Sequence, residues 1–353
     1  MARRKLIWHI GLAQAPRAVI EANLAEHGEA IDEAGVRVVA TADEARLATH
    51  EILRTHREAG LSRHDVEGRW ARICDRVWEH KGTSVLSTPD LCAADKDQLR
   101  FALDPLIGIE VHLVVTLDSF SQQLYGGWLA DLRAGGSTGW DKYVGRVLEH
   151  AVDGTREHAQ AEQFWAGHEL VSILARWGWT FHADRLHVIA QQDVTGHWRE
   201  FAGLAGLSVD ELPAVVPPYA DPAGVAVLRK VNRQLGEPVG RATVDLLVRS
   251  DPERTALPVA PTSSLLPLVE RWQTTLEHAG YDLRGDLVML TEETTEQALP
   301  GPRDQLGVAV DALADALAAN AGLRTRVAQL EDEREKLDRK RRKWKHRAQA
   351  ARG

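Results

Sequence analysis

The sequence contains little cysteine and no long apolar run. Its two cysteines, Cys74 and Cys92, show no CxxC spacing, which excludes a paired-cysteine motif and favours buried structural thiols. No apolar run approaches the ~20 residues that span a bilayer. The first such run is short and is interrupted at His9, so it is unlike the apolar core of a signal peptide. We therefore expect a cytoplasmic protein without a transmembrane segment.

An excess of positive charge is also missing. The formal net charge is −8, which argues against nucleic-acid binding by the chain as a whole. The hydrophobic fraction of 44% and the charged fraction of 27% are those of a soluble globular protein. A length of 353 residues suffices for one large core or two ordinary ones. We expect one α/β domain over residues 1–299 and a helical, basic tail over residues 300–353.

The first clear element is the stretch Lys5 to Leu12, which reads Lys-Leu-Ile-Trp-His-Ile-Gly-Leu. Its apolar residues predict a strand, and residues 19–34 predict the helix that follows. In a parallel sheet, the loop between such a strand and helix directs its backbone N–H groups at an anion, usually phosphate. We therefore expect the loop Ala13 to Ala18 to lie at the functional edge of the sheet.

These residues resemble the opening of the bacterial, mostly actinobacterial, sulfotransferase-family proteins. The likeness rests on His9-Ile10-Gly11-Leu12 and on a helix that ends in Glu33-Ala34-Gly35-Val36. The resemblance implies an α/β fold with a P-loop-like parallel sheet flanked by helices. It also implies 3′-phosphoadenosine 5′-phosphosulfate as the cofactor, whose sulfuryl group is transferred to a hydroxyl of a carbohydrate or small molecule. The positions that match the family's cofactor site are Gly11, Leu12, Gln14, Arg17, Ala18 and Asp118; no catalytic residue and no metal ligand is indicated.

The loop departs from the family's pattern. The family typically reads Pro-Lys-Thr-Gly-Thr-Thr after His-Ile-Gly-Leu, whereas this chain reads Ala-Gln-Ala-Pro-Arg-Ala from residue 13. A phosphate cradle needs free N–H groups, a glycine at the tight turn, a cation and hydroxyl donors. Pro16 stands at the glycine and lacks an N–H, and Gln14 stands at the lysine. Arg17 is the only cation of the loop, and a solvated arginine is the favoured interpretation.

A second signature surrounds the strand predicted over residues 110–116. The run Glu-Val-His-Leu-Val-Val-Thr is typical of a strand buried in a parallel sheet, and Gln123, Leu124 and Trp128 then match the family in register. The family's arginine for the 3′-phosphate falls on Asp118, and its serine falls on Gly126 or Gly127. A carboxylate repels a phosphate by about 1 kcal/mol at 4 Å in water. Two further phosphate contacts are therefore missing.

The resemblance extends over roughly residues 5–295. Residues 41–81 predict helix, residues 84–87 and 185–189 predict strands, and the family's Asn-x-Ser-Leu-Gly motif is replaced at residues 216–221. Asp90 follows one strand end, where helix capping is favoured over catalysis.

Two residue types invite functional interpretations that we do not favour. The histidines at positions 50, 56 and 64 do not share one helix face, so surface residues are favoured over metal ligands. Most of the eleven tryptophans stand beside aliphatic residues, which predicts core packing. Trp177 and Trp179 are the pair kept as an exposed surface.

The C-terminal segment after Pro300-Gly301-Pro302 predicts a long helix. Its apolar residues follow 3-4 spacing, which is typical of a coiled-coil seam, and the pattern is interrupted near Asn320 to Gly322. Seven of the nine residues from Arg339 to Arg347 are Lys or Arg. A solvated single helix, self-association into a homo-oligomer, and a basic arm for an acidic partner, membrane or nucleic acid all stay open.

Three functions follow from these observations. In the first, the chain is a non-catalytic member of a sulfotransferase-like fold, a scaffold or partner-binding pseudoenzyme with no cofactor, because each lost donor typically costs ~10² to 10³ in rate. In the second, it is an active sulfotransferase that holds the cofactor with Arg17 and with Arg133 or Arg146. In the third, the α/β body is a scaffold for assembly through the tail.

Overall fold

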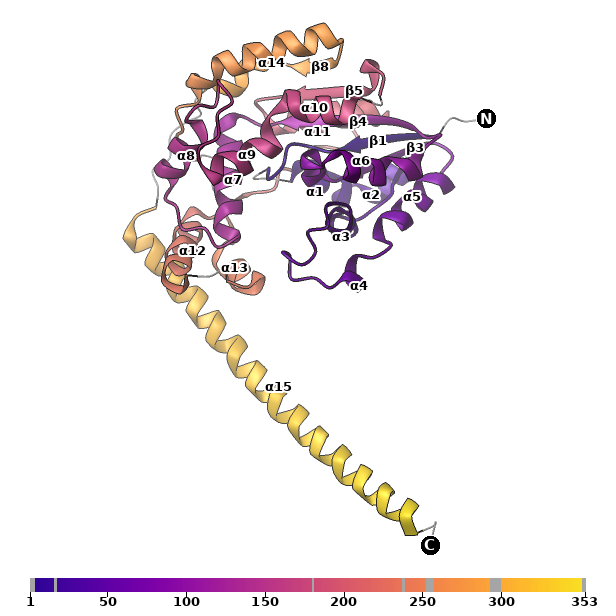
Figure 1. The fold of residues 1–353 in the computed structure, drawn as a ribbon, viewed down its shortest axis with the longest axis vertical. Coiled ribbons are helices and arrows are strands. Elements are labelled where there is room, and N and C mark those ends of the chain that lie inside the picture. Colours follow the sequence, from indigo (N-terminus) through magenta and orange to yellow (C-terminus); the bar gives the residue numbers. More distant parts are fainter. Residues whose placement is uncertain are drawn as a thin grey trace.

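A computed structural model describes residues 4–15, 18–179, 181–236, 239–251, 257–292 and 300–350. Its centre is a six-stranded sheet in which all neighbouring strands are parallel, in the order β2-β3-β1-β4-β5-β8. The strands are β1 (Lys5–His9), β2 (Val36–Val38), β3 (Thr83–Ser87), β4 (Glu110–Leu117), β5 (Leu186–Ala190) and β8 (Asp282–Gly285). The predicted fold class, a parallel sheet flanked by helices with a long C-terminal helix, is confirmed (Figure 1).

Successive residues of β1 enter two different hydrophobic cores. Ile7 packs with the helices of one face, α1 (Val19–Glu26), α2 (Gly28–Glu33) and α11 (Val194–Ala205). Leu6 and Trp8 belong to the larger core of the other face. That core also takes apolar residues of α3 (Ala42–Leu53), α5 (Arg69–Glu79), α6 (Lys96–Leu103), α10 (Leu170–Gly178) and α14 (Leu266–Ala279). Both faces of the sheet are thus covered, as parallel sheets require.

Tryptophan forms the middle of the larger core. Trp8 stacks on Trp70, with ring centroids 5.1 Å apart, and meets the edge of Trp177 at 5.3 Å. Trp177 is fully buried, so the prediction of an exposed pair is wrong for it, whereas Trp179 is 58% exposed. The glycine between them, Gly178, ends α10, and the chain leaves the core there. Core packing is confirmed for most of the tryptophans.

Helices from the middle of the chain extend the body beyond the sheet. They are α7 (Phe120–Arg133), α8 (Trp140–Leu148), α9 (Ala159–His168), α12 (Pro222–Leu235) and α13 (Arg241–Leu247). A short antiparallel pair, β6 (Tyr219–Ala220) with β7 (Ser250–Asp251), lies beside them. Buried Asn232 of α12 donates to the backbone oxygens of Leu132 (2.6 Å) and Gly136 (2.7 Å), which ties α12 to the end of α7.

Helix α15 (Pro302–Ala350) begins on the body and then leaves it. Its early residue Ala312 is buried, and Asp315 forms an ion pair with Arg249. The helix then projects away from α12 and α13 as a single rod (Figure 1), and Leu323, Leu330 and other apolar side chains along it are exposed. By length and composition alone α15 is also a candidate membrane span, with a mean hydropathy of 1.4 in its most apolar window.

Several predicted boundaries differ from the structure. The helix expected over residues 19–34 is broken at His27, whose ring bonds the backbone oxygen of Pro213 at 2.8 Å. The region 41–81 holds three helices, because α4 (Arg63–Val66) separates α3 and α5. The capping role expected for Asp90 is wrong: Thr88 precedes the 3-10 helix η1 (Pro89–Ala93), and Asp95 caps α6 by accepting from two backbone N–H groups.

Candidate functional site

A cavity of about 220 Å³ lies at the carboxyl edge of the sheet, and we call it the strand-edge cavity. It lies where the strand order reverses direction: β2 and β3 lie on one side of β1, whereas β4 and then β5 lie on the other side. Ligands of open α/β sheets bind at such switch points. Its lining is His9, Leu12, Gln14, Ala15, Ala18, Val19, Ile20, Glu21, Pro89, Asp90, Thr116, Asp118 and His197.

The structure brings together four of the six predicted site positions. Leu12, Gln14, Ala18 and Asp118 line the strand-edge cavity. Gly11, which directly precedes Leu12, has φ +50°, and a Cβ there would come within 2.8 Å of Pro89. Only glycine fits this close approach of the loop to η1. Arg17, with Pro16, lies outside the described residues.

A chain of hydrogen bonds runs through the carboxyl ends of three strands. His9 Nε2 lies 2.9 Å from Thr116 Oγ1, and His9 Nδ1 lies 2.6 Å from Ser87 Oγ. The Ser87 hydroxyl donates to Glu21 Oε1 at 2.6 Å. When Glu21 is ionised, this direction requires the proton of His9 on Nδ1, so Nε2 accepts from Thr116. A proton on Glu21 allows every bond of the chain to reverse, so the carboxyl group is coupled to the His9 tautomer.

Burial sets the charges of the side chains in this hydrogen-bond network. Desolvation lowers the pKa of His9 to about 3, with a further contribution from nearby His197, so His9 is neutral at physiological pH. Desolvation raises the pKa of Glu21, and the charges of Asp90 and Asp118 act in the same direction, while the Ser87 bond opposes them. Glu21 is therefore a carboxyl group that lacks a compensating cation among the described residues.

The rest of the strand-edge cavity is acidic. Asp118 Oδ1 lies 3.4 Å from His197 Nδ1, and His197 Nε2 bonds the backbone oxygen of Leu117 at 3.1 Å. Asp90 also lines this cavity, and desolvation raises its pKa, against a backbone hydrogen bond from Gln14. Among the lining residues that the structure describes, there are three carboxylates and neither lysine nor arginine. This lining suits a cation or a hydrogen-bond donor better than a phosphate.

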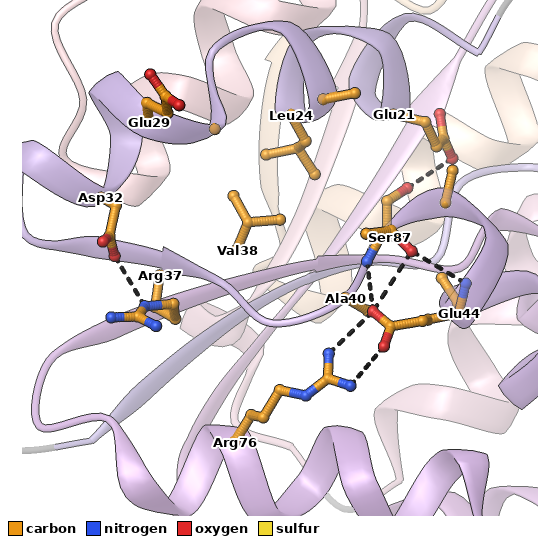
Figure 2. A pocket seen from close by; sticks show the side chains of 15 residues that line it. Glu21, Leu24, Glu29, Asp32, Arg37, Val38, Ala40, Glu44, Arg76 and Ser87 are labelled. Atoms are coloured by element: carbon orange, nitrogen blue, oxygen red, sulfur yellow. Dashed lines mark hydrogen bonds and ion pairs between the residues drawn. The ribbon is translucent and has the colours of Figure 1, made fainter.

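A larger cavity of about 490 Å³, which we call the α1–α3 cavity, shares Glu21 with the first and is also lined by Ser87. Figure 2 shows Glu21 and Ser87 on one side and Asp32 with Arg37 on the other, with Leu24 and Val38 between them. The remaining lining residues are Ala25, Gly28, Glu29, Ala40, Thr41, Ala42, Glu44, Ala45 and Arg76.

Both arginines of the α1–α3 cavity are already paired. Arg76 donates to the two carboxylate oxygens of Glu44 at 3.0 and 2.6 Å, and also to the backbone oxygen of Val39. Its hydrogen bond to Glu44 is the main reason that the pKa of Glu44 falls to about 2. Arg37 lies 2.8 Å from Asp32. These cations hold β2, α2, α3 and α5 together, and in the part of the chain that the structure describes neither pairs with Glu21.

Other candidate groups lie away from these cavities. Arg146 donates to Gln160 at 3.2 Å, and neither Arg146 nor Arg133 lines the strand-edge cavity. Within the described ranges, one group of three residues has the spacing of metal ligands, the exposed Glu149, His150 and Glu157. It lies in a surface loop far along the chain from the strand ends.

Four site residues escaped the sequence predictions: Glu21, Ser87, Thr116 and His197. His9 was noticed only as part of a motif. A signal was present, because His9 and Ser87 end two of the strands and Thr116 stands one residue before the end of a third. Polar residues at strand ends meet at one edge of a parallel sheet, but which strands are neighbours is not given by the sequence.

No protein-family model matches the chain, and no curated protein matches it in sequence. Among solved structures, the chain is similar to a sulfotransferase from Alicyclobacillus acidocaldarius, with 12% sequence identity, a TM-score of 0.38, and coverage of 59% of this chain and 83% of that one. At this TM-score the match assigns neither a family nor an activity.

Proposed function

We propose that this chain is a ligand- or partner-binding protein with a sulfotransferase-like sheet and a degraded nucleotide site, which does not transfer sulfuryl groups from 3′-phosphoadenosine 5′-phosphosulfate. The observation that carries the proposal is the lining of the strand-edge cavity, where Glu21, Asp90 and Asp118 stand around the loop that follows β1.

Electrostatics supports this proposal. The cofactor carries several negative groups, and each carboxylate 4 Å from one of them opposes binding by about 1 kcal/mol in water and about 4 kcal/mol where the effective dielectric constant is near 20. Catalysis of sulfuryl transfer would also need donors aimed at the developing charge, and each missing donor costs ~10² to 10³ in rate. His9 cannot supply positive charge, because its pKa lies far below physiological pH.

Calorimetric titration with adenosine 3′,5′-bisphosphate tests the proposal. We expect no heat of binding up to millimolar nucleotide at pH 7.5. Replacing Asp118 by Asn removes one opposing charge, so any binding by this variant should be tighter than that of the wild type. Thermal unfolding of the same samples controls for folding. A micromolar dissociation constant would overturn the proposal and favour the alternative, an active sulfotransferase that holds its cofactor through Arg17.

We also propose that the outer half of α15 mediates weak self-association. Leu323, Leu330, Leu337 and Trp344 recur every seven residues, and all four side chains are about half or more exposed. The second position of the seam, four residues after each of the first three, holds Val327, Arg334 and Arg341. Arginine at a seam position lowers the stability of a coiled coil, so we expect association only at high concentration.

The tail proposal is tested by light scattering on the full chain and on a truncation after Asn320. This cut keeps Ala312 and the Arg249–Asp315 pair, so the body retains its contacts with α15. We expect the average molar mass of the full chain to rise with concentration, and that of the truncated chain to stay at the value of a monomer. Equal masses for both would remove the assembly role from the tail.

A further inference from the structure

The α1–α3 cavity is built for a small ligand. Its volume of about 490 Å³ falls in the range of small-molecule sites. Its middle is apolar, with Leu24 and Val38 in the centre of the view in Figure 2, and alanines line much of the rest. One end is closed by the carboxyl group of Glu21 and the hydroxyl of Ser87.

The charges around this cavity define the ligand's chemistry. Arg37 and Arg76 each form an ion pair with a carboxylate, Asp32 and Glu44 respectively, so the charge of each cation is already balanced. Glu21, by contrast, has a hydroxyl partner but no cation among the described residues. An anionic ligand would meet an uncompensated carboxylate, whereas a cationic ligand would supply the missing counter-charge.

A bare divalent cation fits less well than an organic one. Two or three carboxylates would have to converge on a metal ion, and in the described part of the chain only the distant Glu149 cluster brings three such ligand atoms within 4.8 Å of one another. A metal ion at Glu21 would also make no use of the apolar wall beside it. A protonated amine carried on an apolar body uses both features.

We propose that the α1–α3 cavity binds a small primary amine, with its ammonium group at the carboxylate of Glu21 and its apolar body against Leu24 and Val38. This inference goes beyond the proposed function, because it concerns a different ligand. It does not depend on whether the strand-edge cavity binds a nucleotide.

The groups around Glu21 predict proton release on binding. Burial and the negative charges of Asp90 and Asp118 raise the pKa of Glu21, Ser87 donates to it, and His9 beyond Ser87 is neutral. An arriving ammonium group stabilises the ionised carboxylate, so at a pH at which the raised pKa leaves Glu21 protonated in the empty site, binding releases that proton. Affinity therefore rises with pH until Glu21 is already ionised in the free protein.

The test uses calorimetry on the full chain with 2-phenylethylamine and n-hexylamine, each paired with its uncharged alcohol. Since a charge-assisted hydrogen bond is worth about 1.5–3 kcal/mol, we expect each amine to bind about 10- to 100-fold more tightly than its alcohol. Titrations in phosphate and in HEPES, whose ionisation enthalpies differ and neither of which is a primary amine, measure the released proton.

Glu21→Gln should abolish the preference for the amine and the release of a proton, while the matched variant Glu33→Gln, at an exposed position outside the cavity, should keep both. Thermal unfolding shows whether each variant is folded. The inference is overturned if the alcohols bind as tightly as the amines, if Glu21→Gln binds the amines unchanged, or if none of the four compounds binds the wild type at millimolar concentration.

Discussion

Replacing Glu21 by Gln should stabilise the empty protein at neutral and alkaline pH. In the wild type the folded-state pKa of Glu21 is raised, first by burial and then by Asp90 and Asp118. A raised pKa means that the folded state holds a proton that the unfolded state has lost. The contribution of Glu21 to stability is therefore complete below the unfolded pKa and is lost as pH rises through the folded pKa.

The size of the effect follows from the same linkage. Each unit by which the pKa is raised is worth about 1.4 kcal/mol of unfolding free energy, or about 0.5 M in the urea midpoint for an m-value near 3 kcal/mol/M. Glutamine does not titrate, and its amide oxygen can still accept from Ser87. The difference between variant and wild type should thus grow from pH 4.5 upward and then level off at the folded pKa of Glu21.

Urea unfolding followed by tryptophan fluorescence, at intervals from pH 4.5 to 8.5, measures this difference. When Ser87 is replaced by Ala in both chains, the stability difference should level off at a higher pH, because the Ser87 hydrogen bond opposes the rise in the pKa of Glu21. Glu33→Gln, at an exposed position on the next helix, is the matched control. A flat difference for Glu21→Gln, or one that falls with pH, would refute the reasoning about this carboxyl group.

Three further predictions concern stability and reactivity. Asn232→Ala removes two side-chain hydrogen bonds, to the backbone oxygens of Leu132 and Gly136, and should cost about 1–3 kcal/mol in urea unfolding. A loss below about 0.5 kcal/mol would contradict this. Arg76 lowers the pKa of Glu44 to about 2, so the wild type should be more stable to unfolding than Glu44→Gln by about 1–2 kcal/mol after screening at this partly exposed pair. This difference in unfolding free energy should shrink as pH falls from 4.5 to 2, and a constant difference over this range argues against the pair. Burial raises the pKa of Cys74 and of Cys92 to about 12, so a disulfide reagent at pH 8 should modify both only in denaturant, and rapid labelling of the native chain would show otherwise.

The strands were predicted where the sequence pattern is sufficient. Residues 110–116 form a nearly continuous apolar run because most of β4 is buried, and the observed strand, Glu110–Leu117, matches closely. β8 (Asp282–Gly285) was not predicted, because half of this edge strand is charged. Asp282 accepts from His187 of the neighbouring strand β5 at 2.6 Å and from Arg284 of its own strand at 2.9 Å. Such polar contacts leave no periodic pattern in the sequence.

The candidate site was predicted only in part. The resemblance located the loop after β1 and Asp118, which do lie together around the strand-edge cavity. It gave no reason to join Glu21, Ser87 and Thr116, which are separated by 66 residues and then 29. Their contact with each other through His9 depends on β1 lying between β3 and β4, and strand order follows from tertiary packing rather than from local pattern.

The projecting course of α15 separates two opposite electrical environments in one molecule. Residues 339–353 hold eight Lys and Arg and no Asp or Glu, although the whole chain is negative. At 1.5 Å per residue, Arg339 lies roughly 35 Å along the helix from Asp315, where α15 still contacts the body. Because the Debye length is about 8 Å at physiological ionic strength, an approaching molecule senses the positive tip without the field of the acidic body.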